Sequence, residues 1–149
     1  MNWEQIKAKL SNHFTEDQIN NGVKVKVYFN LHNKTFSVAS GQGSNYGKVL
    51  FYSNNIILDN VRFSVGEKGR DKVLKSKRKN VHAFCYGTLS KKNINDITVH
   101  QAVSYNPYTA GYFYYINNNK KIDNCDHLIM SVINQRGKLW TGVKNETKE

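Results

Sequence analysis

The hydrophobic pattern of the chain changes from helical spacing at the N-terminus to a period of two from residue 23 onward. In residues 23–32 apolar and polar side chains alternate strictly, which is typical of a β-strand with one face on a core and one face in water. Asn33-Lys34 predicts a tight turn, and residues 35–39 predict a returning strand. Similar short patterns recur as far as Val143, with residues 56–58 and 61–63 as separate extended segments.

The first 22 residues predict two helices. Trp3, Ile6 and Leu10 recur at helical spacing. Thr15, with Gln18 three residues later, fits the capping box of a second, short helix. Because the strand that follows has only one apolar face, its sheet must be covered by another element. We therefore expect the N-terminal helical segment to pack on the main domain, with Trp3 largely buried.

A third helix is expected in the most basic part of the chain. Ser64 with Glu67 fits an N-terminal capping box, with Ser64 as the cap. Val73 is one of the apolar residues that would face the core, and Gly69 weakens the helix without forbidding it. The cations of Lys77–Lys79 are expected at the helix end, where the macrodipole favours them.

Together these elements predict an α+β fold. It would be mainly an antiparallel twisted sheet or small barrel, with an N-terminal helix and one inserted basic helix. Residues 23–143 would form a single β-rich domain, residues 1–22 the helical segment packed on it, and residues 144–149 a frayed polar tail. We expect no signal peptide and no membrane span, because no apolar run is long enough for either.

Charge changes this picture most. The formal net charge is +11, and seven of the 22 Lys and Arg residues fall within twelve positions. A cluster this dense repels itself, so folding alone does not account for it, whereas a polyanionic partner does. The alternative interpretation is a solvated helix face. The seven cations are Lys68, Arg70, Lys72, Lys75, Lys77, Arg78 and Lys79.

The residues that follow the cations are aromatic. His82, Phe84 and Tyr86 would share one face of a strand, where an imidazole and two rings beside cations can stack on unpaired bases. The alternative is that this row packs under the neighbouring helix. We select His82 and Tyr86, together with the seven cations, as candidate residues for binding nucleic acid or another partner.

Signals for catalysis or for a metal site are weak. The five histidines show no metal-ligand spacing, and the chain has no HExxH, paired Cys-x-x-Cys or EF-hand motif. Cys85 and Cys125 are expected to be buried free thiols in a reducing cytosol. We expect no cofactor, no metal and no catalytic residue. The enzymatic alternative is a small metal-independent nuclease in which His82 and His100 meet across adjacent strands.

Two motifs carry a family resemblance. Residues 77–84 read KRKNVHAF, and residues 105–108 read YNPY. With weaker matches on either side, roughly residues 25–140 resemble a family of small uncharacterised bacteriophage proteins. The resemblance implies a phage or mobile-element origin and one compact domain. It brings no established activity, so it implies no catalytic residue.

We therefore expect a non-enzymatic, phage-type accessory protein. It would bind nucleic acid (DNA or RNA) or a nucleoprotein complex of the host through the basic helix and the strand after it. One role within this class is inhibition of a host defence complex, such as a CRISPR or restriction nuclease. The protein would act in the host cytoplasm, without a membrane partner. The alternatives are the nuclease described above and a structural or assembly protein of the phage particle.

Overall fold

The structure is a computed structural model that describes residues 2–145 of the chain. The helices are α1 (Trp3–Leu10), α2 (Glu16–Asn20) and α3 (Glu67–Ser76), and two short 3₁₀ helices are η1 (Gly43–Asn45) and η2 (Ile94–Asp96). The strands are β1 (Lys24–Asn30), β2 (Thr35–Ser40), β3 (Val49–Ser53), β4 (Asn55–Val65), β5 (Ala83–Leu89), β6 (Ile97–Ser104), β7 (Tyr114–Tyr115), β8 (Asn124–Ile133) and β9 (Arg136–Lys144).

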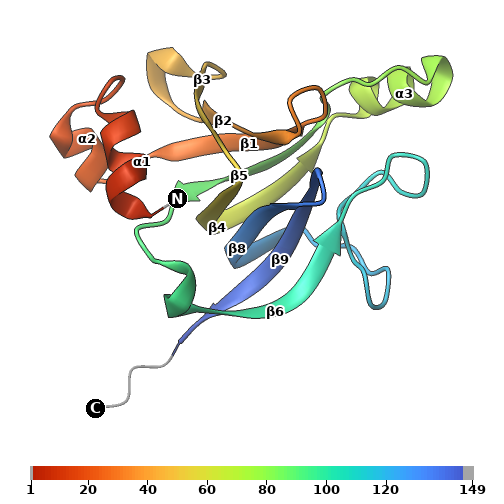
Figure 1. Ribbon diagram of the computed structural model, residues 1–149. Coiled ribbons are helices and arrows are strands. Elements are labelled where there is room, and N and C mark those ends of the chain that lie inside the picture. Colours follow the sequence, from red (N-terminus) through yellow and green to blue (C-terminus); the bar gives the residue numbers. More distant parts are fainter. Residues whose placement is uncertain (1, 146–149) are drawn as a thin grey trace.

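These nine strands form one sheet in the order β3-β2-β1-β5-β4-β8-β9-β6-β7. Every pairing within it is antiparallel. Figure 1 shows that the sheet is strongly twisted, and that α3 projects away from it beyond the ends of β4 and β5. The fold is α+β and is dominated by antiparallel sheet, as predicted.

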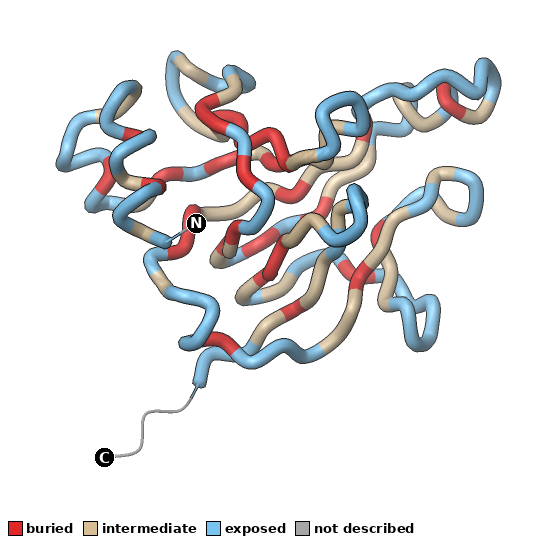
Figure 2. Tube along the Cα trace, viewed as in Figure 1, coloured by how far each residue is buried: buried red, intermediate tan, exposed pale blue. Residues whose placement is uncertain are grey.

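Alternation along the strands divides the sheet into a core face and a solvent face, and β1 shows this most clearly. Val25 and Val27 are buried, whereas Lys24 is exposed and Lys26 is half-buried on the opposite face. Figure 2 shows that the buried residues are concentrated along the central strands. Each buried Val or Leu contributes roughly 1.5–3 kcal/mol relative to an exposed one, which makes this face the main source of stability.

The N-terminal helices complete the core. Ile6 and Leu10 of α1 and Ile19 of α2 are buried in the same hydrophobic cluster as the sheet residues. Trp3 is partly buried and packs against this cluster, and the Lys91 ammonium lies 5.7 Å from the centroid of its ring. Helix α1 thus packs on the sheet through Ile6 and Leu10, and the burial of Trp3 beside them is intermediate.

β4 is one strand of eleven residues, where the sequence predicts two short segments. Asn60 has a left-handed conformation (φ 52°), and the pairing of β4 with β5 shifts register between Asp59 and Arg62. A β-bulge of this kind lets a strand continue through polar residues and increases its local twist. The polar pair Asp59-Asn60 therefore bends the strand instead of ending it.

α3 begins two residues after β4 ends. Ser64 lies within β4, and Gly66 is the N-terminal cap of α3, without a side-chain hydrogen bond. The predicted capping box of Ser64 and Glu67 is therefore wrong. The reason is that the ladder between β4 and β5 continues as far as Val65, so strand pairing overrides the local capping signal.

Candidate nucleic-acid interface

An open groove lies along α3, between the helix and the segment that follows it. Val73 is the buried residue of α3, and Figure 2 shows that most of the helix is exposed. The helix ends at Ser76, and the left-handed conformation of its C-terminal cap, Lys77 (φ 57°), turns the chain so that the next residues border the helix. The groove, termed the α3 groove, is lined by Lys68, Asp71, Lys72, Lys75, Ser76, Arg78, Lys79 and Asn80.

Five cations border the α3 groove against a single carboxylate, that of Asp71. Among residues 2–145, none of these five cations forms an ion pair. Like charges held together in this way repel one another, and salt screens them over about 8 Å at physiological ionic strength. A chain of phosphates would replace the repulsion with attraction and would release counterions. The groove is therefore suited to binding a polyanion.

Arg70 differs from the other cations because its side chain has a protein partner. The Arg70 Nε–H donates a hydrogen bond to the Pro107 carbonyl oxygen at 3.0 Å. Its guanidinium also lies close to Gly111, where a Cβ would be 3.3 Å from Nη1. Arg70 therefore ties α3 to the loop between β6 and β7, and its first role is to hold the helix in place.

His82 lies beneath α3 and is 8% exposed. Its Nδ1 is 2.7 Å from the Asn80 carbonyl oxygen, and its Nε2 is 2.6 Å from the Tyr105 hydroxyl. In the neutral ring Nδ1–H donates to the carbonyl, and Nε2 accepts from the hydroxyl. Gly69 of α3 leaves room for the ring, since a Cβ there would lie 2.5 Å from the His82 Cβ. The base-stacking role predicted for His82 is therefore wrong, and its packing under the helix is the interpretation that holds.

The two motifs that carry the family resemblance meet at this point. His82, from the first motif, is hydrogen-bonded to Tyr105 of the second. Arg70 is hydrogen-bonded to Pro107 of the second motif. The Tyr105 ring in turn packs against Phe113, with centroids 5.2 Å apart, and Phe113 belongs to the core. The second motif thus connects the base of α3 to the hydrophobic core.

Tyr86 belongs to a second group of aromatic and cationic residues, on the solvent face of three central strands. Lys26 of β1 and Arg62 of β4 lie directly opposite Tyr86 in the two ladders of β5. Phe84, two residues earlier in β5, packs edge-on against Tyr28, with centroids 5.8 Å apart and planes at 86°. We term this group of five residues the aromatic–cationic face.

The cations of this face lie over its rings. The Lys26 Nζ is 4.0 Å from the centroid of Phe84, and the Arg62 Cζ is 4.5 Å from the centroid of Tyr86. Partial burial, together with a contact between the Tyr86 and Tyr46 hydroxyls at 3.4 Å, raises the pKa of Tyr86 to about 12. Tyr86 therefore presents a neutral ring at physiological pH.

The sequence identifies Tyr86 and the aromatic character of Phe84 but misses the other members of the face. Lys26, Tyr28 and Arg62 come from strands that are distant in sequence from β5. The alternation in β1 does place Lys26 and Tyr28 on a solvent-exposed face, and this is the one sequence signal that could have identified them as members of the aromatic–cationic face. Only the pairing of β1 with β5 and of β5 with β4 brings them beside Tyr86.

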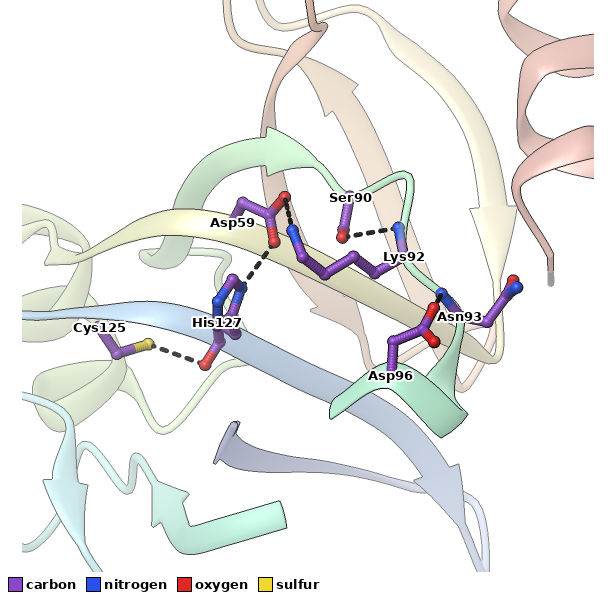
Figure 3. A network of polar contacts seen from close by, with 7 residues as sticks. All are labelled: Asp59, Ser90, Lys92, Asn93, Asp96, Cys125 and His127. Carbon is purple, nitrogen blue, oxygen red and sulfur yellow. Dashed lines mark hydrogen bonds and ion pairs between the residues drawn. The ribbon is translucent and has the colours of Figure 1, made fainter. Parts of the chain in front are cut away.

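The histidine pair of the nuclease alternative does not form. His82 precedes β5 and His100 lies in β6, and β4, β8 and β9 separate these two strands in the sheet. The pairing of His82 with His100 across adjacent strands is therefore wrong. The histidine with a carboxylate partner within the described chain is His127, whose Nδ1 is 2.8 Å from Asp59 Oδ1. Figure 3 shows that the Lys92 ammonium, 3.6 Å away, contacts the other carboxylate oxygen of Asp59.

Other reactive groups are few in residues 2–145. In this range no cluster of three or more His, Cys, Asp or Glu residues is placed to hold a metal ion. Cys85 and Cys125 are free thiols, and burial raises the pKa of both, that of Cys125 to about 12. Thiols that stay protonated at neutral pH are poor nucleophiles.

Across the same residues, no helix has the length and apolar character needed to cross a membrane.

Comparison with known proteins identifies the family of the chain. The family model described as Mycobacterium phage L5 gene 82 protein matches residues 18–136. The Gene 82 protein of Mycobacterium phage L5 is 31% identical over 115 residues, which cover 73% of this chain and 90% of that protein. No solved structure matches the chain significantly. The bacteriophage family expected from the sequence is confirmed: the chain belongs to the family of the Mycobacterium phage L5 gene 82 protein.

Proposed function

We propose that this phage protein binds nucleic acid through the α3 groove. The observation that carries the proposal is the set of five groove cations, which have no ion-pair partner among the described residues. Arg70 and His82 hold α3 at its base, so the cations are presented on a fixed support. Lys77, at the end of the same helix, adds a sixth exposed cation beside the groove.

The wider role we propose is that of a non-enzymatic accessory protein in the host cytoplasm. The phage family and the net charge of +11 support this role. Its target would be free nucleic acid or the nucleic acid of a host nucleoprotein. Covering the nucleic acid of a CRISPR or restriction complex would block that complex, which makes inhibition of host defence the specific form of the proposal.

The test is a triple variant, Lys72→Ala, Lys75→Ala and Arg78→Ala, in a binding assay over a range of salt concentrations. For the wild-type protein, log K should fall with log salt by about 0.7 per contacted phosphate on a single strand and about 0.9 on duplex DNA. The triple variant should bind more weakly and should lose about two to three units of this slope. An unchanged slope in a folded triple variant would contradict the proposal.

A matched control removes the same charge elsewhere. Lys9, Lys138 and Lys144 are exposed and lie outside α3. The variant with all three changed to Ala has the same net charge as the groove variant, so it reproduces any effect of overall charge. It should keep nearly the wild-type affinity, because its cations do not line the α3 groove. Equal losses in the two variants would mean that the charge acts only as a diffuse field.

One observation supports a second candidate function, that of a metal-independent nuclease. The contact between Asp59 and His127 orients an imidazole as general acid–base catalysis requires, and the Lys92 ammonium is next to it. The test is incubation with labelled single-stranded DNA and RNA in the presence of EDTA. Cleavage that is lost in His127→Ala but retained in His100→Ala would establish the nuclease. If the wild-type protein leaves the substrate intact, the nuclease candidate is excluded and only the binding function remains.

A further inference from the structure

We infer that the nucleic acid is single-stranded and that its bases stack on the aromatic–cationic face of β1, β5 and β4. The inference rests on the proposed function, because the α3 groove would hold the backbone of the same strand. It adds a class of ligand and a second contact surface. The rings of this surface, Phe84 and Tyr86, are suited to bases, whereas the groove cations are suited only to phosphates.

The two rings are set side by side on one strand. Phe84 and Tyr86 have centroids 6.3 Å apart and planes inclined at 52°. Tyr28 packs edge-on against Phe84 and supports it from the neighbouring strand. Each ring is only half-buried, so part of its surface is open to solvent. Rings that follow one another along a strand can accept successive bases of any sequence, since every base has a π-face.

The cations of the face are positioned to exchange partners. In the free protein Lys26 lies over Phe84, and Arg62 lies over Tyr86. A cation at an exposed ring is held weakly. When a base takes its place over the ring, the flexible Lys26 side chain can turn to the adjacent phosphate of the same strand. The face therefore provides both a stacking surface and the charge that neutralises the backbone beside it.

The aromatic–cationic face is close to the α3 groove along the chain. β4 leads into α3 and the segment after α3 leads into β5, so the face adjoins the base of the helix. Phe84 comes five positions after Lys79, a distance of at most about 17 Å along an extended chain. Asp59, an acid further along β4, is paired with the Lys92 ammonium, which offsets its charge. One strand can therefore follow positive charge from the groove to the rings.

A duplex would not use this face. Its bases are stacked inside and paired, so they have no free surface to offer to Phe84 or Tyr86, whereas its phosphates can still occupy the α3 groove. An acidic protein would likewise use the cations and not the rings. Dependence on the rings is therefore what separates a single-stranded nucleic acid from the other polyanions.

The experiment compares two variants, Phe84→Leu and Tyr86→Leu, on two labelled probes at one salt concentration. The probes are a short oligothymidylate and a DNA duplex of the same length. Each variant should weaken binding of the oligothymidylate by at least about fivefold, the lower end of the range for loss of one base–ring stack. Duplex binding should not change. Tyr112→Leu is the control, because Tyr112 is 39% exposed, has Lys121 Nζ 5.9 Å from its ring and lies outside the face.

A second measurement does not depend on the variants folding. The wild-type protein is photocrosslinked to an oligonucleotide that carries iodouracil, and the crosslinked peptides are identified by mass spectrometry. Crosslinks at Phe84 or Tyr86 are expected. Crosslinks confined to α3 would overturn the inference. In the binding assay, an equal loss of affinity for the oligothymidylate and for the duplex in the Leu variants would also overturn it.

The failures of the two proposals can be told apart. If the triple groove variant loses affinity for both probes while Phe84→Leu binds the oligothymidylate normally, the stacking inference is wrong and the proposed function stands. If the wild-type protein binds neither probe, both are wrong.

Discussion

Gly69 is a point of close approach between α3 and the segment that follows it. A Cβ at this position would lie 2.5 Å from the His82 Cβ and 3.2 Å from the Asn80 side-chain nitrogen. Real Cβ atoms do not approach other carbons so closely, so α3 or His82 would have to shift. The glycine is therefore required by space, although it lowers the intrinsic stability of the helix.

We expect Gly69→Ala to destabilise the protein by about 1–3 kcal/mol, the range for overpacked sites. The direction of this change is the discriminating result, because the same substitution at an open position inside a helix stabilises the protein by about 0.8–1 kcal/mol. Urea unfolding followed by circular dichroism measures the difference. A variant at least as stable as the wild type would show that α3 does not press on His82.

The hydrogen bond between Tyr105 and His82 allows a second prediction for a single residue. Tyr105→Phe removes the hydroxyl and leaves the buried His82 Nε2 without its partner at 2.6 Å. An orphaned buried polar group costs about 1–3 kcal/mol, so the free energy of unfolding should fall by that amount. Tyr108→Phe is the control, since Tyr108 is 60% exposed and should change stability by less than about 0.5 kcal/mol. Equal values for the two variants would exclude a role for this bond.

At the scale of elements, local signals in the sequence place most strands and the N-terminal helices. The predicted capping box of Thr15 and Gln18 forms at the start of α2, because nothing competes with it there. Ser64 carries a similar signal but lies in β4, where pairing with β5 is stronger than the cap. The order of the sheet is not contained in any local pattern. For this reason the sequence identifies Tyr86 but not Lys26 or Arg62 as its neighbours.

The N-terminal helix provides the prediction at this scale. Leu10 of α1 is fully buried in the core cluster, so Leu10→Ala should lower the free energy of unfolding by about 2–5 kcal/mol. Lys9→Ala, on the exposed side of the same helix, should change it by less than about 0.5 kcal/mol. Chemical denaturation measures both. If Leu10→Ala melts normally but changes the oligomeric state in light scattering, α1 serves an interface between molecules instead.

At the scale of the whole molecule, partly or fully buried thiol and phenol groups make the protein less stable as the pH rises into the alkaline range. Burial raises the pKa of the Cys125 thiol from near 9 to about 12, and it raises the pKa of Cys85 and Tyr105 as well. A group whose pKa is higher in the folded state keeps its proton there while the unfolded chain loses it. Its stabilising contribution is therefore complete below pH 9 and is lost as the pH rises from about 9 towards 12.

We expect the melting temperature to fall between about pH 9 and 10, in a range where lysines remain mostly charged. Cys125→Ala should make this fall shallower, because one group that titrates late in the folded state is gone. Differential scanning fluorimetry of the two proteins side by side measures the slopes. Parallel slopes would show that the Cys125 thiol titrates alike in the folded and unfolded states.

The order of the sheet also sets the timing of folding. β1 pairs with β5, and β4 pairs with β8, so the central ladders join segments that leave the ribosome far apart in time. Closing such loops lowers the entropy of the chain before stabilising contacts form to compensate. Proteins with this topology therefore fold in milliseconds to seconds. The ladder between β4 and β8 cannot close until residues up to Ile133 have been synthesised. The edge of β4 that pairs with β8 therefore stays open for most of translation, accessible to chaperones and proteases.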